Sequence, residues 1–226
     1  MRYLFAHAHP DDETLASGVL IAYLVDAGHE VFVLTGTRGE QGEVVPGPWS
    51  HLVGTDALVE RREAELAGAL AELGVTGSAW LGAPHRVYRD SGMVWIRPGL
   101  AGPADQTDAR ALSVAPLDDV ARDIESYAAT IGADVLVSYD ADGGYGHPDH
   151  VRMHEASVIA SGRLGIPFRA LVDAPGEGVE WFVLDDYLPR AVAALNHHQT
   201  QLTVVGDSVV HSGGQQEKIL VRLGLQ

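Results

Sequence analysis

Short apolar runs alternate with longer segments of helical hydrophobic spacing along most of the chain. Residues 2–8 form an apolar run that is typical of a buried strand, and residues 13–27 then carry apolar side chains at helical spacing before Gly28. The segment after Asp185 shows no clear period. By the same criteria we predict strands at residues 31–34, 78–81, 134–138, 168–172 and 181–184, and helices at 56–73, 117–131 and 149–161.

This alternation predicts the fold class. Strands that alternate with helices are typical of an α/β fold: a Rossmann-like, doubly wound, mainly parallel sheet with helices on both faces. A chain of 226 residues is long enough for one such domain, so we expect residues 1–226 to form a single domain.

Three polar loops follow predicted strands, at residues 9–13, 36–47 and 140–150. Ligands of open parallel sheets bind beyond the carboxyl ends of the strands, where the strand order reverses. In the common doubly wound order the first and fourth strands are neighbours at that point, so loops about 140 residues apart in sequence meet there. We therefore expect the first and third loops to build one site.

These two loops carry residues that bind metals. His9 and Asp12 are three residues apart at the start of a helix, so both side chains lie on one side of its first turn, and His150 supplies a third ligand from the other loop. Two imidazoles, one carboxylate and an open position suit a catalytic zinc ion. The chain has no cysteine, which excludes a thiolate site, a disulfide and a cysteine nucleophile.

Neighbouring residues offer acid and base groups. Asp11 lies beside the ligands and is free to accept a proton from water, His147 is placed to donate one to a leaving amine, and Asp149 is placed to orient an imidazole. Taken singly, these carboxylates are also what an ordinary helix N-terminus carries. Two such clusters after neighbouring strands favour the catalytic interpretation. We expect His7 in the core or behind the ligands, and His154 behind them as the main rival ligand.

Charge and composition exclude some classes of binding partner. A formal net charge of −16, with 15 basic against 31 acidic residues, argues against nucleic acid. No apolar stretch is long enough to cross a bilayer and no signal-peptide pattern opens the chain, so we expect a cytoplasmic protein with a small-molecule substrate and no membrane partner. The sequence does not exclude a homo-oligomer.

The segments Ala-His-Pro-Asp-Asp-Glu at residues 8–13 and Gly-His-Pro-Asp-His at residues 146–150 resemble the PIG-L/LmbE-like zinc deacetylases. That family hydrolyses N-acetyl groups of glucosamine-containing molecules, and some related amides, on a Rossmann-like fold. The resemblance implies the same ligands as above, His9, Asp12 and His150, with Asp11 as base and His147 as acid and electrostatic stabiliser.

Further segments, at residues 39–43, 89–93 and 143–146, are similar to the actinobacterial mycothiol branch of that family. Enzymes of that branch deacetylate a glucosamine-inositol pseudodisaccharide or cleave mycothiol conjugates. The resemblance implies that Arg62 and Asp90 hold sugar hydroxyls, that Glu43 and Met93 line the pocket, and that Tyr145 acts near the oxyanion.

The resemblance covers most of residues 1–155, which implies a metal-site core there. Residues 156–226 form a shorter segment than in the mycothiol enzymes, share mainly His-Gln-Thr-Gln at 198–201, and are expected to shape the pocket. We therefore expect a hydrolase that uses Zn²⁺, or Fe²⁺ or another divalent metal, to remove an N-acyl group from an amino-sugar-containing molecule. The alternatives are an amidase on a thiol conjugate or natural-product intermediate, a non-haem iron oxygenase, and a non-catalytic metal- or sugar-binding protein.

Overall fold

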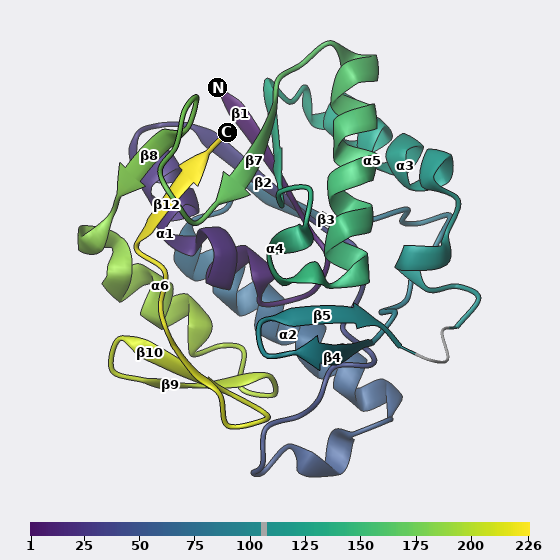
Figure 1. The fold of residues 1–226 in the computed structure, drawn as a ribbon, viewed down its shortest axis with the longest axis vertical. Coiled ribbons are helices and arrows are strands. Elements are labelled where there is room, and N and C mark those ends of the chain that lie inside the picture. The colour runs from purple at the N-terminus through teal and green to yellow at the C-terminus, as the bar shows by residue number, and fades with distance from the viewer. Residues whose placement is uncertain (105–107) are drawn as a thin grey trace.

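A mainly parallel sheet runs through the protein. The computed structural model describes residues 1–104 and 108–226, and within them seven strands form one sheet in the order β3-β2-β1-β6-β7-β12-β8 (Figure 1). The first five strands of that order are parallel. They are β1 (Arg2–His7), β2 (Glu30–Thr35), β3 (Gly77–Trp80), β6 (Val135–Ser138) and β7 (Phe168–Val172).

Strand β1 lies at the centre of this parallel set. Its Phe5 pairs with Val33 of β2 on one side and with Val137 of β6 on the other. The chain proceeds outward from β1 through β2 to β3, and then returns to the opposite side of β1 for β6. The strand order therefore reverses between β1 and β6, which confirms that the loops after these two strands are neighbours.

Helices cover both faces of the sheet, as expected for a doubly wound fold (Figure 1). Alternate residues of β1 point to opposite faces, so Leu4 and Ala6 pack in one apolar core and Phe5 in the other. The core around Phe5 includes α1 (Asp12–Asp26), α2 (Asp56–Leu73) and α6 (Leu188–Leu195), and the core around Leu4 includes α3 (Leu117–Ile131) and α5 (Pro148–Leu164).

The C-terminal part of the chain completes the sheet by antiparallel pairing. Strand β12 (Arg222–Leu225) lies between β7 and β8 (Glu180–Val183) and is antiparallel to both. A separate three-stranded antiparallel sheet and a hairpin also form, and neither had been predicted from the sequence. They consist of β9 (Leu202–Val205), β10 (Ser208–His211) and β11 (Gln216–Lys218), and of β4 (Met93–Arg97) with β5 (Leu100–Pro103).

Short turns complete the architecture. The segment α4 (Gly143–Gly146) is a single irregular turn that precedes α5. Three 3₁₀ turns, η1 (Ser50–Leu52), η2 (Leu112–Val114) and η3 (Asp185–Tyr187), lie in connecting segments. Among the helices of the described ranges, none combines the length and the apolar character that crossing a bilayer requires.

Candidate metal centre and active site

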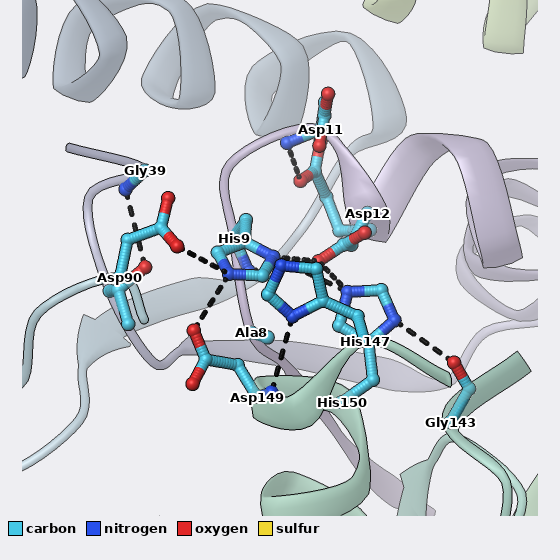
Figure 2. A network of polar contacts seen from close by, with 12 residues as sticks. Ala8, His9, Asp11, Asp12, Gly39, Asp90, Gly143, His147, Asp149 and His150 are labelled. Carbon is cyan, nitrogen blue, oxygen red and sulfur yellow. Dashed lines mark hydrogen bonds and ion pairs between the residues drawn. The ribbon is translucent and has the colours of Figure 1, made fainter. Parts of the chain in front are cut away.

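Three side-chain atoms converge where the β1–α1 loop meets the start of α5. Nδ1 of His9 lies 3.2 Å from Oδ2 of Asp12, and Nε2 of His150 lies 3.3 Å from the same oxygen and 3.3 Å from His9 Nδ1. Figure 2 shows the three side chains turned toward one another, although His9 and His150 are 141 residues apart. The structure therefore brings together the three ligands predicted from the sequence.

The remaining nitrogens of both rings have hydrogen-bond acceptors. His9 Nε2 donates to Oδ2 of Asp149 at 3.1 Å, and His150 Nδ1 donates to the carbonyl oxygen of Gly143 at 3.2 Å. These bonds leave the lone pairs of His9 Nδ1 and His150 Nε2 directed at the Asp12 carboxylate. Three acceptor atoms packed this closely repel one another unless a cation lies between them. The arrangement can thus hold a metal ion.

Asp12 itself is held by Tyr139, which directly follows β6. The Tyr139 hydroxyl donates to Asp12 Oδ2 at 2.7 Å and accepts the backbone N–H of Ala8 at 2.8 Å. The ring of Tyr139 also stacks on that of His150, with centroids 4.1 Å apart. A tyrosine that contacts two of the three candidate ligands, Asp12 and His150, fixes their relative positions.

Asp149 is fully buried and orients His9. Its carboxylate accepts the Ser91 hydroxyl, accepts the Ser91 backbone N–H at 2.9 Å, and faces His9 as described. Burial opposes ionisation, but the hydrogen bond from His9 and the charges of His9 and His147 lower the pKa of Asp149 below its ordinary value. The expected partnership of Asp149 with an imidazole is therefore made with His9.

His147 lies against the rings of both His9 and His150, with ring centroids 4.5 Å and 4.9 Å away. Its Nδ1 accepts the backbone N–H of Asp149 at 3.2 Å, which leaves the proton of the neutral ring on Nε2. Burial, followed by the neighbouring His9 and His150, lowers the pKa of His147 to about 2. One donor atom each of His9, His147 and His150 also lie within 4.8 Å of one another, so His147 is an alternative ligand.

Asp11 has an unusual backbone. It is the only described non-glycine residue with a positive φ, at 106°, and most side chains clash with the backbone there. No hydrogen bond to its carboxylate is present among the described residues, whereas its backbone N–H donates to Glu13. Burial and the adjacent charge of Asp12 raise the pKa of Asp11 to about 7. The carboxylate thus accepts no hydrogen bond from the described residues, and it is close enough to Asp12 and His9 for their charges to change its pKa.

Negative charge accumulates around His9. Although burial disfavours protonation, the carboxylates of Asp90, Asp12 and Asp149 raise the pKa of His9 well above its ordinary value. Asp90 Oδ1 lies 3.7 Å from His9 Nε2. A buried site in which carboxylates favour a positive imidazole also favours a bound cation.

The turn before α5 requires glycine at two positions. A Cβ on Gly143 would lie 2.8 Å from the Cβ of His150, and a Cβ on Gly146 would lie 2.9 Å from the carbonyl oxygen of Ala101 in β5. Between them, Tyr145 places its ring 5.1 Å from the His150 ring and 5.7 Å from that of Trp95 in β4. Partial burial, and then the charges of Asp12 and Asp11, raise the pKa of Tyr145, so its hydroxyl is a hydrogen-bond donor.

The residues expected to bind substrate occupy different environments. Asp90 is buried beside His9, whereas Met93 is the partly buried first residue of β4. Arg62 is 1% exposed and donates to the carbonyl oxygens of Gly39, Gly42 and Glu43. The exposed Glu43 side chain accepts a hydrogen bond from Ser212 near the C-terminal sheet. Arg62 therefore shapes the loop that presents residue 43, and a direct contact of Arg62 with sugar remains a prediction.

His7 and His154, the two histidines that we expect outside the ligand set, occupy supporting positions. His7 is fully buried, contacts Ser17 at 3.0 Å, and has its pKa lowered to about 4 by burial. His154 donates through Nδ1 to the Tyr139 carbonyl oxygen at 2.8 Å, and its ring packs on Phe168. Neither belongs to the groups of metal-competent side chains found in the described ranges.

Sequence reasoning assigned no role to Tyr139, Ser91, Trp95, Glu13 or His198, all of which contact the site or its immediate supports. Tyr139 could have been found, because it directly follows the fourth parallel strand at the switch point. Ser91 could have been suspected only from its place beside Asp90. Buried Glu13 and His198 pair at 2.9 Å across 185 residues, a contact without local signal.

Comparison with known proteins identifies the family of the chain. A family model described as PIG-L, GlcNAc-PI de-N-acetylase, matches residues 4–161. A 1D-myo-inositol 2-acetamido-2-deoxy-alpha-D-glucopyranoside deacetylase from Kineococcus radiotolerans is 47% identical over 178 residues, which cover 78% of this chain and 46% of that protein. A protein of the same name from Streptomyces avermitilis is 39% identical over 211 residues, 91% of this chain and 67% of the relative. The chain thus spans about half the length of the Kineococcus relative.

Solved structures share the fold. A teicoplanin deacetylase in a zinc-inhibited form superposes with a TM-score of 0.63 at 21% identity, over 88% of this chain and 84% of that one. An N,N'-diacetylchitobiose deacetylase from Pyrococcus horikoshii gives 0.60 at 20% identity, over 88% and 69%. Because the family model covers residues 4–161, including both His-Pro-Asp segments, the chain belongs to the PIG-L (GlcNAc-PI de-N-acetylase) family.

Proposed function

We propose that the protein is a zinc-dependent N-deacetylase that removes the acetyl group from an N-acetylglucosamine unit of a small glycoside. One observation carries the proposal. Three acceptor atoms, from His9, Asp12 and His150, converge within 3.3 Å of one another, and the carboxylate of the adjacent Asp11 accepts no hydrogen bond from the described part of the chain. The names of the curated relatives support the substrate class.

The donor set fits zinc in its spacing and chemistry. Tetrahedral zinc with ligands at about 2.0–2.1 Å has donor atoms about 3.3–3.4 Å apart, and the three distances here are 3.2, 3.3 and 3.3 Å. In both His9 and His150, the ring nitrogen that faces away from Asp12 donates its N–H to an oxygen, as zinc-bound histidines usually do. A zinc ion bound by these residues would supply Lewis acidity toward water and the amide carbonyl.

His147 fits better as a hydrogen-bond donor than as a fourth ligand. Its Nδ1 already accepts the Asp149 N–H, and its ring packs beside the two ligand rings. We assign its Nε2–H, together with the Tyr145 hydroxyl, to the oxygen that becomes negative when the amide carbonyl is attacked.

Asp11 is assigned as the general base. Its carboxylate adjoins Asp12, carries no hydrogen bond in the described part of the chain, and so can accept the proton of the attacking water. The protonated Asp11 then transfers this proton to the departing amine, which balances the step. His147, whose ring is neutral because Nδ1 accepts the Asp149 N–H, keeps its Nε2 proton and acts as the hydrogen-bond donor. Asp149 keeps His9 in the tautomer that presents Nδ1 to Asp12. Acetate and the free amine are the products.

The test is acetate release from an N-acetylglucosaminide with a small aglycone. The purified protein reconstituted with Zn²⁺ is expected to release acetate and free amine in equal amounts, and to lose this activity after chelation. Release that is unaffected by complete metal removal would contradict the proposal. Sugar binding without acetate release would support a non-catalytic binding protein, and metal-dependent oxygen uptake would support the oxygenase alternative.

Trp95 is expected to hold the sugar or its aglycone. It is 51% exposed on β4, and its ring lies beside Tyr145 at the edge of the site. Stacking on an aromatic face contributes about 0.5–1.5 kcal/mol, so Trp95→Ala is expected to raise KM about 2- to 10-fold with little change in kcat. The matched control is Val94→Ala, because neighbouring residues of a strand point to opposite faces. An equal rise in KM for both variants would contradict this role.

A further inference from the structure

A buried acid–imidazole pair lies behind the site and takes no part in the chemistry proposed above. Glu13 and His198 are both 0% exposed, and His198 Nε2 lies 2.9 Å from Glu13 Oε1. Glu13 is the second residue of α1, whereas His198 follows α6 near the C-terminal sheet. A fully buried charged group is costly unless it is paired, so the pair needs a structural or functional reason.

The pair is connected to the proposed base through the backbone. The second carboxylate oxygen of Glu13, Oε2, accepts the backbone N–H of Asp11 at 2.9 Å. Gln201 completes the series, with its Nε2 3.3 Å from His198 Nδ1, so that the His198 Nε2–H is directed at Glu13. A continuous set of hydrogen bonds thus runs from Gln201 to the one described non-glycine residue with a positive φ.

The turn that carries His198 is itself anchored on other parts of the site. Thr200 donates through its backbone N–H to Glu65 Oε1 at 3.0 Å and through its hydroxyl to Glu65 Oε2 at 2.8 Å. Its carbonyl oxygen accepts the Val45 N–H at 2.9 Å. These bonds attach the turn to α2 and to the loop after β2. The turn is therefore a fixed support for Glu13 rather than a mobile end.

We propose that His198 is a positioning residue that, through Glu13, holds Asp11 in its strained backbone conformation. Strained backbone persists only where surrounding contacts hold it, at a cost of about 1–3 kcal/mol. Glu13 contacts the N–H of Asp11 directly, and His198 fixes the carboxylate of Glu13 from the opposite side. This inference rests on the proposed function only in naming Asp11 as the base.

His198→Ala tests the proposal by kinetics. It is expected to lower kcat about 10-fold with KM and bound zinc unchanged, and His198→Gln, which keeps an N–H donor, is expected to recover most of the rate. The matched control is His197→Ala, an exposed neighbour 3.5 Å from Glu72, which is expected to match wild type. In an Asp11→Asn background, His198→Ala is expected to change the residual rate less than twofold, because its effect passes through Asp11.

Hydrogen exchange tests the same contact without an activity assay. Amide exchange in the peptide that contains Asp11 is expected to be about 10-fold faster in His198→Ala than in wild type or His197→Ala. Unchanged exchange, or an equal kinetic effect in the Asp11→Asn background, would overturn the positioning role. An inactive wild type would contradict the proposed function and leave the exchange result to decide this inference. Melting temperatures identify a variant that fails to fold. If His198→Ala fails to fold, the kinetics and amide exchange of His198→Gln test the positioning role instead.

Discussion

Replacing Asp11 by glycine is expected to lower kcat about 10²- to 10⁴-fold and, in the same variant, to raise the free energy of unfolding by about 1 kcal/mol. The rate falls because the proton acceptor is lost. Stability rises because glycine adopts a φ of 106° without a side-chain clash, which offsets the larger entropy of glycine in the unfolded chain. Steady-state acetate release and urea denaturation measure the two quantities.

Asp11→Asn is the matched control for this pair of effects. It keeps a side chain of the same size in the strained conformation and removes the carboxylate, so its kcat should fall as in Asp11→Gly with a smaller gain in stability. A glycine variant that is as active as wild type would refute the base assignment. A glycine variant less stable than Asp11→Asn would show that the backbone conformation is not strained.

His150→Ala is expected to abolish zinc binding and to reduce turnover at least about 10³-fold, because one of three protein ligands disappears. Metal content of the dialysed protein and acetate release measure this result. The matched control is His154→Ala, one helical turn later in α5, where the imidazole donates to a backbone carbonyl instead of facing the ligand cluster. The control is expected to retain its zinc.

Two further variants, His147→Ala and Asp12→Ala, distinguish the two candidate ligand sets. If His147→Ala removed zinc as completely as His150→Ala while Asp12→Ala kept it, the ligands would be the three histidines, and Asp12 would lose its assigned place. Retention of zinc by His147→Ala, with a lowered kcat, is expected if His147 is a donor to the substrate.

Local sequence patterns predicted most of the sheet and its helices. The predicted bounds 56–73, 117–131 and 168–172 coincide with α2, α3 and β7, and the ends of the other predicted elements lie within three residues of those observed. Apolar runs and helical spacing sufficed because these elements bury one face or both against the same two cores. The adjacency of β1 and β6 followed from the usual doubly wound order, and it predicted correctly which loops meet.

What could not be predicted depends on contacts between distant residues. Strand β12 pairs with β7 and β8, but its four residues, Arg-Leu-Gly-Leu, carry no signal of their partners. The hairpin of β4 and β5 exposes Val94, Trp95 and Ile96, so it lacks the apolar and polar alternation of a half-buried strand.

The same limit applies to the site. The convergence of His9, Asp12 and His150 could be predicted because all three occupy short motifs after strands, whereas the partners that orient them come from elsewhere. The Asp149 carboxylate contacts His9 rather than the nearby His147, and Ser91 holds it from a loop 58 residues away. Such choices depend on side-chain directions that sequence spacing does not specify.

The antiparallel insertion of β12 has a consequence for any shortened form of the protein. The family model ends at residue 161, but β7, β8 and β12 all follow it and share backbone hydrogen bonds. A fragment cut at that boundary would leave β6 as an open sheet edge and would lose the turn that carries His198. The family model and the sheet therefore end at different places, and fragments for expression or for grafting onto other proteins need the last strand.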